Sequence, residues 1–188
     1  MARIPYINKN TADPEVAQLF TKIEDNGAQV LNVWKIAAHS PTTLAHLIRL
    51  GNTVLSKTQL NPKLRETAVL CVSEILGCDY ERAAHIVMGK ATGMTEEQIS
   101  SIKKWQKSDI YSKTEQSVLR FTDEFIRNGK PSQSTFADLE KHMSHRELME
   151  LTVTIGFYEL LAKLLLTFEV DMEDSTLTPL QIAGKLKD

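Results

Sequence analysis

Apolar residues recur at intervals of three and four along most of the chain, with polar residues between them. Two of these stripes consist of Leu64, Ala68, Cys71, Val72 and Ile75, and of Val118, Phe121, Phe125 and Ile126. This spacing is that of an α-helix with one buried face. No run of alternating apolar and polar residues suits a β-strand, so the pattern predicts an all-α protein.

Capping residues predict where these helices begin and end. Three stand directly before a proline that suits the first helical turn: Asp13, Ser40 and Asn61. Three more begin a capping box: Thr95 with Gln98, Ser112 with Glu115, and Ser144 with Glu147. Three glycines stand at expected helix ends: Gly27, Gly93 and Gly129. The predicted helices are 14–26, 30–38, 41–57, 62–76, 79–92, 95–106, 112–128, 132–142 and 145–168, with a bend near Gly156 and a further short helix within 179–186.

A short motif occurs twice in the sequence. Arg65-Glu66, followed by Leu70 and Val72, leads to Gly77 and Tyr80, and Arg146-Glu147, followed by Leu151 and Val153, leads to Gly156 and Tyr158. The repeat predicts two related helical hairpins within one helical bundle. Chance agreement between two amphipathic helices is the alternative.

The composition argues against two classes of partner. Apolar residues make up 42% and charged residues 24% of the 188 residues, with 22 Lys and Arg against 24 Asp and Glu. A net charge of −2 gives no reason to expect nucleic acid or an acidic membrane surface as a partner. The N-terminal sequence lacks the apolar run of a signal peptide, and no segment approaches the roughly 20 apolar residues of a membrane span. We therefore expect a cytoplasmic protein.

The two cysteines, Cys71 and Cys78, are not expected to form a disulfide. A structural disulfide is unfavourable in a reducing compartment. On one continuous helix, their spacing would separate them by about 10.5 Å along the axis, beyond the roughly 7 Å limit for the Cα atoms of a disulfide.

The segment around Gly77 holds the candidate chemistry. A second helix is expected to open at Cys78, and on it Cys78, Glu81 and His85 fall within an arc of about 60°. A thiol near a helix N-terminus and a protonated histidine has the ingredients for a lowered pKa. A tight return at Gly77 would bring Glu66 alongside the second helix, where its carboxylate could orient His85. The ordinary interpretation is a surface pair of Glu81 and His85 beside a small buried cysteine.

The same residues resemble a known family. Glu66, Cys78 and His85 have the spacing of the AhpD-like signature, in which a glutamate precedes a Cys-x-x-Cys pair and a histidine. Other matching segments are Ala2-Arg3-Ile4-Pro5, Ala38-His39-Ser40-Pro41, Leu64-Arg65-Glu66, Gly77-Cys78-Asp79-Tyr80-Glu81 and Ile155-Gly156-Phe157-Tyr158. The chain is similar to the carboxymuconolactone decarboxylase family of the AhpD-like superfamily. The resemblance implies an AhpD-like helical bundle in residues 1–172, a tail in 173–188 with a short oligomer-contact helix, and a homo-oligomer, either a trimer or a hexamer.

Glu81 stands where AhpD-like peroxidases have their second cysteine. This departure argues against a dithiol peroxidase, and Cys71 is badly placed to replace the missing thiol. The resemblance instead implies a lyase that works without a cofactor on a small carboxylated molecule, with Glu66, Cys78, Glu81 and His85 as catalytic candidates. The alternatives are an antioxidant peroxidase that uses Cys78 alone and a non-catalytic, ligand-binding oligomer.

Other residues are weighed for substrate contact. The candidates are Tyr80, Arg82, Tyr158 and His39, and the cations available to an anionic substrate also include Arg65 and Lys35. A tyrosine offers a donor beside an apolar body. The ordinary interpretation makes the cations solvated surface residues and His39 a loop-fixing residue. The five histidines lack a His-x-x-x-His spacing, so no metal is expected.

Overall fold

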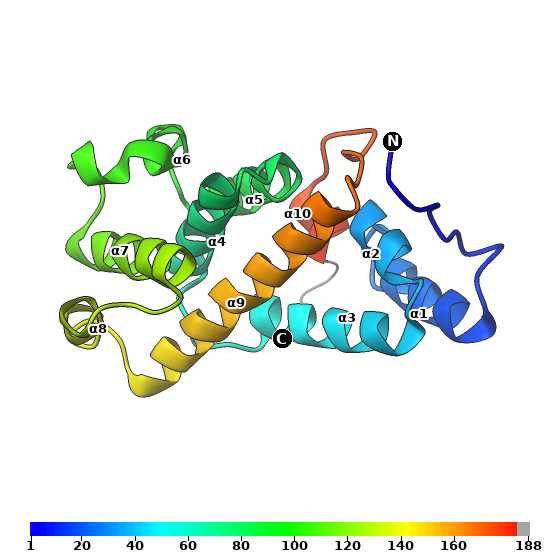
Figure 1. The fold of residues 1–188 in the computed structure, drawn as a ribbon, viewed down its shortest axis with the longest axis horizontal. Coiled ribbons are helices and arrows are strands. Elements are labelled where there is room, and N and C mark those ends of the chain that lie inside the picture. Colours follow the sequence, from blue (N-terminus) through cyan, green and yellow to red (C-terminus); the bar gives the residue numbers. More distant parts are fainter. Residues whose placement is uncertain (184–188) are drawn as a thin grey trace. The chain divides into compact units, whose positions relative to one another are not determined.

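The fold is built from helices alone in residues 1–183, which are the residues that the computed structural model describes (Figure 1). The helices are α1 (Pro14–Asp25), α2 (Asn32–Ala37), α3 (Pro41–Ser56), α4 (Pro62–Leu76), α5 (Asp79–Ala91), α6 (Glu96–Ser101), the 3₁₀-helix η1 (Ile102–Lys107), α7 (Lys113–Asn128), α8 (Gln133–Leu139), α9 (His145–Thr167) and α10 (Pro179–Ala183). The all-α prediction is confirmed. The segment predicted as one helix at 95–106 is divided into α6 and η1, and the last three residues of the segment 179–186 lie outside the described residues.

Most of the predicted caps are present. The side chain of Asp13 accepts a hydrogen bond from the backbone N–H of Val16, and that of Asn61 accepts from Lys63. All three predicted capping boxes form. Ser40 is the exception, because its hydroxyl bonds to the hydroxyl of Thr43 and makes no bond to the helix backbone.

The chain divides into two compact units. The first comprises Met1–Lys57 and the residues from Lys163 onward, and the second comprises Thr58–Ala162. Within the first unit, the N-terminal segment is tied to the segment that follows α9. The backbone N–H of Arg3 donates to Phe168 O at 2.8 Å, and the hydroxyl of Tyr6 donates to Asp171 at 2.9 Å.

Helix α4 is the inner helix of the second unit. Every residue from Arg65 to Ser73 is buried, so no face of this stretch meets solvent. Helices α5 and α7 pack against it. A helix that is covered all round carries every side chain into the interior, and the charged pair Arg65 and Glu66 is therefore buried with its apolar neighbours.

Gly77 turns the chain from α4 into α5. Its φ of 67° and ψ of 35° lie in the left-handed region, which glycine adopts without steric cost. The N–H of Cys78 donates to Ser73 O at 2.9 Å and closes the end of α4. The second copy of the repeated motif makes no such turn, because Gly156 lies inside the unbroken helix α9. Phe157, an apolar residue, follows Gly156, so no capping side chain starts a new helix there.

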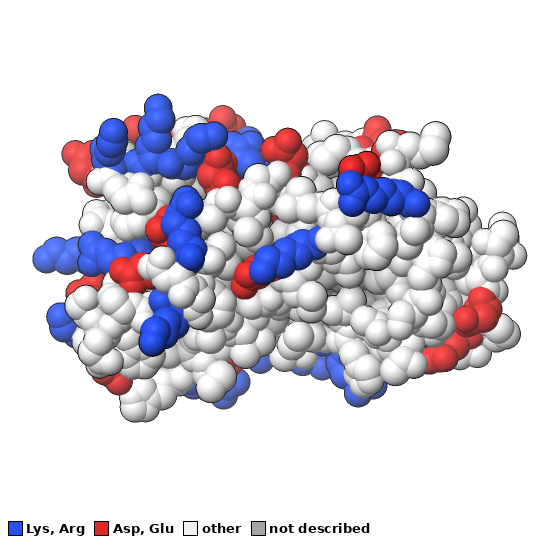
Figure 2. Space-filling view, viewed as in Figure 1, with Lys and Arg blue, Asp and Glu red and all other residues white. Residues whose placement is uncertain are grey.

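Charged side chains of both signs share the surface, as Figure 2 shows. Lys and Arg gather over α6 and η1, where Lys103, Lys104 and Lys107 are exposed. Lys103 lies 3.3 Å from Glu74, so part of this charge is paired. None of the helices in residues 1–183 combines the length and hydrophobicity of a membrane-spanning segment.

Candidate active site

Four charged side chains form a continuous row inside the second unit. The Arg65 Nε lies 2.8 Å from Glu66 Oε1, and the other carboxylate oxygen of Glu66 lies 2.7 Å from His85 Nδ1. His85 Nε2 lies 3.4 Å from Glu81 Oε2. Helix α4 supplies the first two residues and α5 the last two, so the Gly77 turn that joins these helices creates the row.

All four side chains are withdrawn from solvent. The exposed fractions are 4% for Arg65, 0% for Glu66, 5% for Glu81 and 3% for His85. The ordinary interpretation of Glu81 and His85 as a surface pair is therefore wrong. Burial of four ionisable groups is costly unless each charge is paired, and the alternation of cation and carboxylate along the row supplies those partners.

The pairing sets the charge of Glu66 and His85. Burial by itself would raise the pKa of Glu66, but the charges and hydrogen bonds of His85 and Arg65 lower it below its ordinary value. Burial would likewise lower the pKa of His85, but the charge and hydrogen bond of Glu66, together with the charge of Glu81, raise it. These interactions favour an ionised Glu66 and a protonated His85, with the Nδ1–H of His85 donating to Glu66.

Glu81 is the member of the row that changes charge near neutral pH. Burial raises its pKa to about 7, although the charge of His85 partly offsets the effect. The negative charge of Glu66 adds to the rise. A carboxyl group that holds its proton until about pH 7 is available in both the acid and the base form at physiological pH.

Cys78 occupies the N-cap position of α5, but its side chain makes no capping hydrogen bond, and its thiol is not activated. It is 2% exposed, and burial raises its pKa to about 11. Backbone N–H groups of Glu81 and Tyr80 lower the pKa, and the carboxylates of Glu81 and Asp79 raise it. The expectation of a lowered pKa is therefore wrong, because desolvation at this position outweighs the helix N-terminus.

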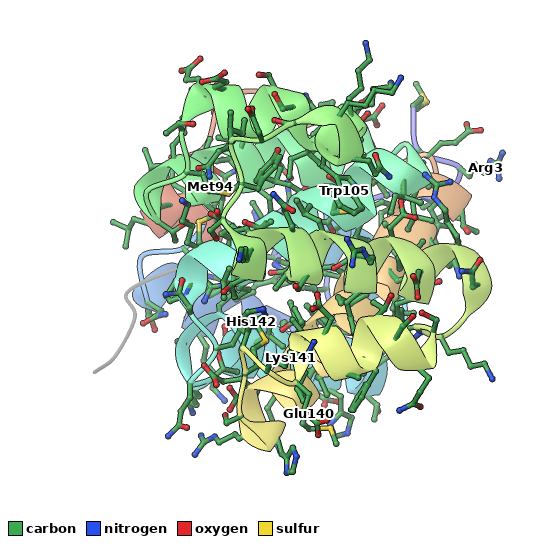
Figure 3. The ribbon with its side chains drawn as sticks, turned by 90° about the vertical axis from the view of Figure 1, so that its left-hand side faces the viewer. Arg3, Met94, Trp105, Glu140, Lys141 and His142 are labelled. Carbon is green, nitrogen blue, oxygen red and sulfur yellow. The ribbon has the colours of Figure 1, made fainter. Side chains whose placement is uncertain are left out.

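Cys71 belongs to a different part of the interior. It lies in an apolar cluster that includes Leu70, Met94 and Trp105, the last two labelled in Figure 3. Burial raises the pKa of its thiol above the ordinary value. Both cysteines are free thiols, so the expected absence of a disulfide between them holds in this structure.

Tyr158 brings α9 to the site. Its ring meets the imidazole of His85 edge to face, with centroids 4.6 Å apart and planes at 81°. The side chain is buried, and burial together with the charges of Glu66 and Glu81 raises the pKa of the phenol well above its ordinary value. Tyr158 is therefore a neutral phenol in contact with His85. Tyr80, the other tyrosine candidate, is buried at the start of α5.

The other predicted site residues lie outside the row. Arg82 is half-exposed and pairs with Glu74 at 3.1 Å. His39 belongs to the first unit, where its Nε2–H donates to Pro5 O at 2.7 Å, a contact that fits the loop-fixing interpretation. Lys35 bonds to Asn32. In residues 1–183, no group of three or more His, Cys, Asp and Glu side chains is arranged to hold a metal ion.

Arg65 has a place in the site that the sequence did not indicate. The sequence suggests Arg65 only as a cation for an anionic substrate, whereas in the structure its Nε contacts the carboxylate of Glu66. Adjacent residues on a helix do not normally face each other, so the spacing of Arg65 and Glu66 held no signal for this pair.

Comparison with known proteins finds one family model that matches part of the chain, and several similar structures. The model of the carboxymuconolactone decarboxylase family matches residues 41–124. A protein of unknown function from Agrobacterium tumefaciens, related to the antioxidant defence protein AhpD, is similar in structure with a TM-score of 0.68 and 25% identity, over 74% of this chain and 96% of that one. No curated protein sequence matches the chain.

Two further structures share the fold at lower identity. An uncharacterised peroxidase-related protein from Ralstonia eutropha, with an alkylhydroperoxidase AhpD core, has a TM-score of 0.79 and 18% identity, over 92% of this chain and 93% of that one. The debrominase Bmp8 in complex with 2,3,4-tribromopyrrole has a TM-score of 0.75 and 16% identity, over 90% of each chain.

The chain thus shares the helical fold of the AhpD-core structure, and its second unit holds a buried row of carboxylate and imidazole groups. Over residues 41–124, the chain is similar to the carboxymuconolactone decarboxylase family.

Proposed function

We propose that this protein is an enzyme that transfers protons with its own side chains, acting as a lyase on a small carboxylated molecule. The single observation that carries the proposal is the buried row in which His85 lies between Glu66 and Glu81. The match of residues 41–124 to the family model supports an enzyme of this class, and the family's name supplies carboxymuconolactone as the first substrate to test.

The two ring nitrogens of His85 have different roles in this proposal. Nδ1 is held by the ionised Glu66, so the proton that moves is the one on Nε2, which faces Glu81. Decarboxylation breaks the bond between the carboxylate carbon and the adjacent carbon of the substrate. Carbon dioxide leaves, and the electron pair of the broken bond stays with that adjacent carbon as part of a dienolate. That carbon then takes a proton from Glu81 or His85, and the site regains a proton from solvent. Such transfer from a placed group accelerates a reaction by about 10² to 10⁴.

The test is a reaction in deuterated water. We expect incubation with carboxymuconolactone, or with a panel of small carboxylated lactones, to release carbon dioxide and to yield a product with one deuterium at the former carboxylated carbon. Proton magnetic resonance follows the conversion of substrate into product and the deuterium at that carbon in one sample. A thermal-shift screen of the same panel identifies which compounds bind. The proposal is rejected if bound compounds neither lose carbon dioxide nor exchange protons.

The second candidate function is a peroxidase that uses one thiol. Its support is the similarity to peroxidase-related proteins and the presence of Cys78. At a pKa of about 11, only about one thiol in ten thousand is ionised at pH 7. We therefore expect little peroxide turnover with a dithiol reductant.

A gain-of-function variant makes the peroxide assay decisive. Glu81→Cys restores the paired cysteines of the AhpD-like signature, and we expect it to raise peroxide turnover above that of the unmodified protein. Robust turnover by the unmodified protein, abolished in Cys78→Ser, would instead establish the one-thiol peroxidase.

The homo-oligomer implied by the resemblance stays a prediction. A trimer or a hexamer requires a light-scattering mass three or six times that of the 21.2 kDa protomer. A mass of 21.2 kDa at micromolar concentration contradicts it.

A further inference from the structure

The carboxylate of Glu66 is divided between two cations. One oxygen accepts from Arg65 Nε at 2.8 Å and the other accepts from His85 Nδ1 at 2.7 Å. Glu66 is completely buried, and both cations are almost completely buried. Water therefore has little part in balancing these charges, and the effect of each cation on the other is transmitted at low dielectric.

A buried carboxylate with only an imidazole as its partner would hold that imidazole in the protonated form. Releasing the proton would leave a buried anion without a counter-charge, which is strongly unfavourable. With Arg65 on the second oxygen, Glu66 keeps a cationic partner whether His85 is charged or neutral. The arrangement thus removes the main obstacle to release of a proton by His85.

The other groups that face the imidazole act in known directions. Glu66 on α4 and Glu81 on α5 raise the pKa of His85, while burial and the positive charge of Arg65 lower it. Tyr158 on α9 meets the ring edge to face and stays neutral because its own pKa lies well above the ordinary range. Arg65 is the only cation among these neighbours of His85 in the described part of the chain.

We propose that Arg65 is a positioning residue that shares the carboxylate of Glu66 with His85, orients that carboxylate, and leaves the imidazole able to give up and regain its proton. The proposal rests on the proposed proton-transfer function and assigns Arg65 a task within it.

The test follows the titration of His85 by nuclear magnetic resonance on isotope-labelled histidine, with the His85 signal assigned from its loss in His85→Gln. In Arg65→Gln the cation is removed and the carboxylate of Glu66 acts on His85 alone. We expect the midpoint of the His85 titration to move upward by about one pH unit or more. Arg65→Lys keeps the charge, and we expect a midpoint close to that of the unmodified protein.

Arg146→Gln is the matched control. Arg146 pairs with Glu150 at 2.9 Å on α9 and has no part in the row, so its loss should leave the His85 midpoint unchanged. A folded Arg65→Gln variant with an unchanged or lowered midpoint would overturn the proposal. An equal upward shift in the Arg146 variant would overturn it too, because the effect would then be general.

If Arg65→Gln does not fold, the titration of His85 in the unmodified protein tests the proposal. We expect His85 to lose its proton reversibly within the pH range in which circular dichroism shows the native helices. An imidazole that stays protonated throughout that range overturns the proposal. These titrations need no substrate. Failure to find an enzymatic reaction would count against the proposed function and would leave the result for Arg65 standing.

Discussion

Replacement of His85 by glutamine should lower turnover by a factor of about one hundred or more, the usual scale for the loss of a general acid or base. The imidazole lies between Glu66 and Glu81 and contacts both of them. Glutamine is similar in size and cannot take up a proton. Rates are measured by the deuterium assay, and circular dichroism checks that the helices are retained.

The same substitution at His142 is the matched control. His142 is exposed at the C-terminal side of α8, and its replacement should leave turnover unchanged. Glu66→Gln should cause a smaller loss than His85→Gln. It should also move the pH midpoint of activity downward, because the charge of Glu66 raises the pKa of His85. Full turnover in both site variants, with an unchanged pH profile, would show that the row is structural.

Glu81→Gln should stabilise the folded protein at alkaline pH. The pKa of Glu81 is raised from its ordinary value of 4.5 to about 7. A raised pKa in the folded state means that the stability contributed by the protonated group is complete below about 4.5 and is lost as pH rises towards 7. The difference between these two pKa values lowers the free energy of unfolding by about 3 kcal/mol at alkaline pH. Glutamine does not have this cost because it has no proton to lose.

Urea unfolding at two pH values measures this effect. We expect Glu81→Gln to match the unmodified protein at about pH 4 and to exceed its free energy of unfolding by about 3 kcal/mol at about pH 8.5. Glu97→Gln is the control, because Glu97 is exposed on α6. A difference between the two proteins that does not change with pH would show that Glu81 titrates in the folded state much as it does in the unfolded chain. If the Glu81 variant is also slow in turnover, the site retains a destabilising carboxylate for its chemistry.

Local features of the fold could be read from the sequence because their causes are local. The caps at Asp13 and Asn61 depend on a side chain and a backbone two or three residues away. The Gly77 turn depends on a backbone conformation that glycine adopts most readily. The contact between Glu66 and His85 could be predicted from the sequence for a similar reason, because a tight turn between two helices brings their faces together.

The properties that make these residues a candidate active site depended on the tertiary structure. From spacing alone, Glu81 and His85 could be either part of a site or an ordinary surface pair, and a lowered pKa was expected for Cys78. In the structure all three are buried, and the pKa of Cys78 is raised. Desolvation is set by what covers a side chain, and here the cover includes Tyr158, which is far from His85 in the sequence. The helices and the order of the charged groups thus follow from local sequence patterns, whereas the packing of distant helices around these groups sets the direction in which each pKa is shifted.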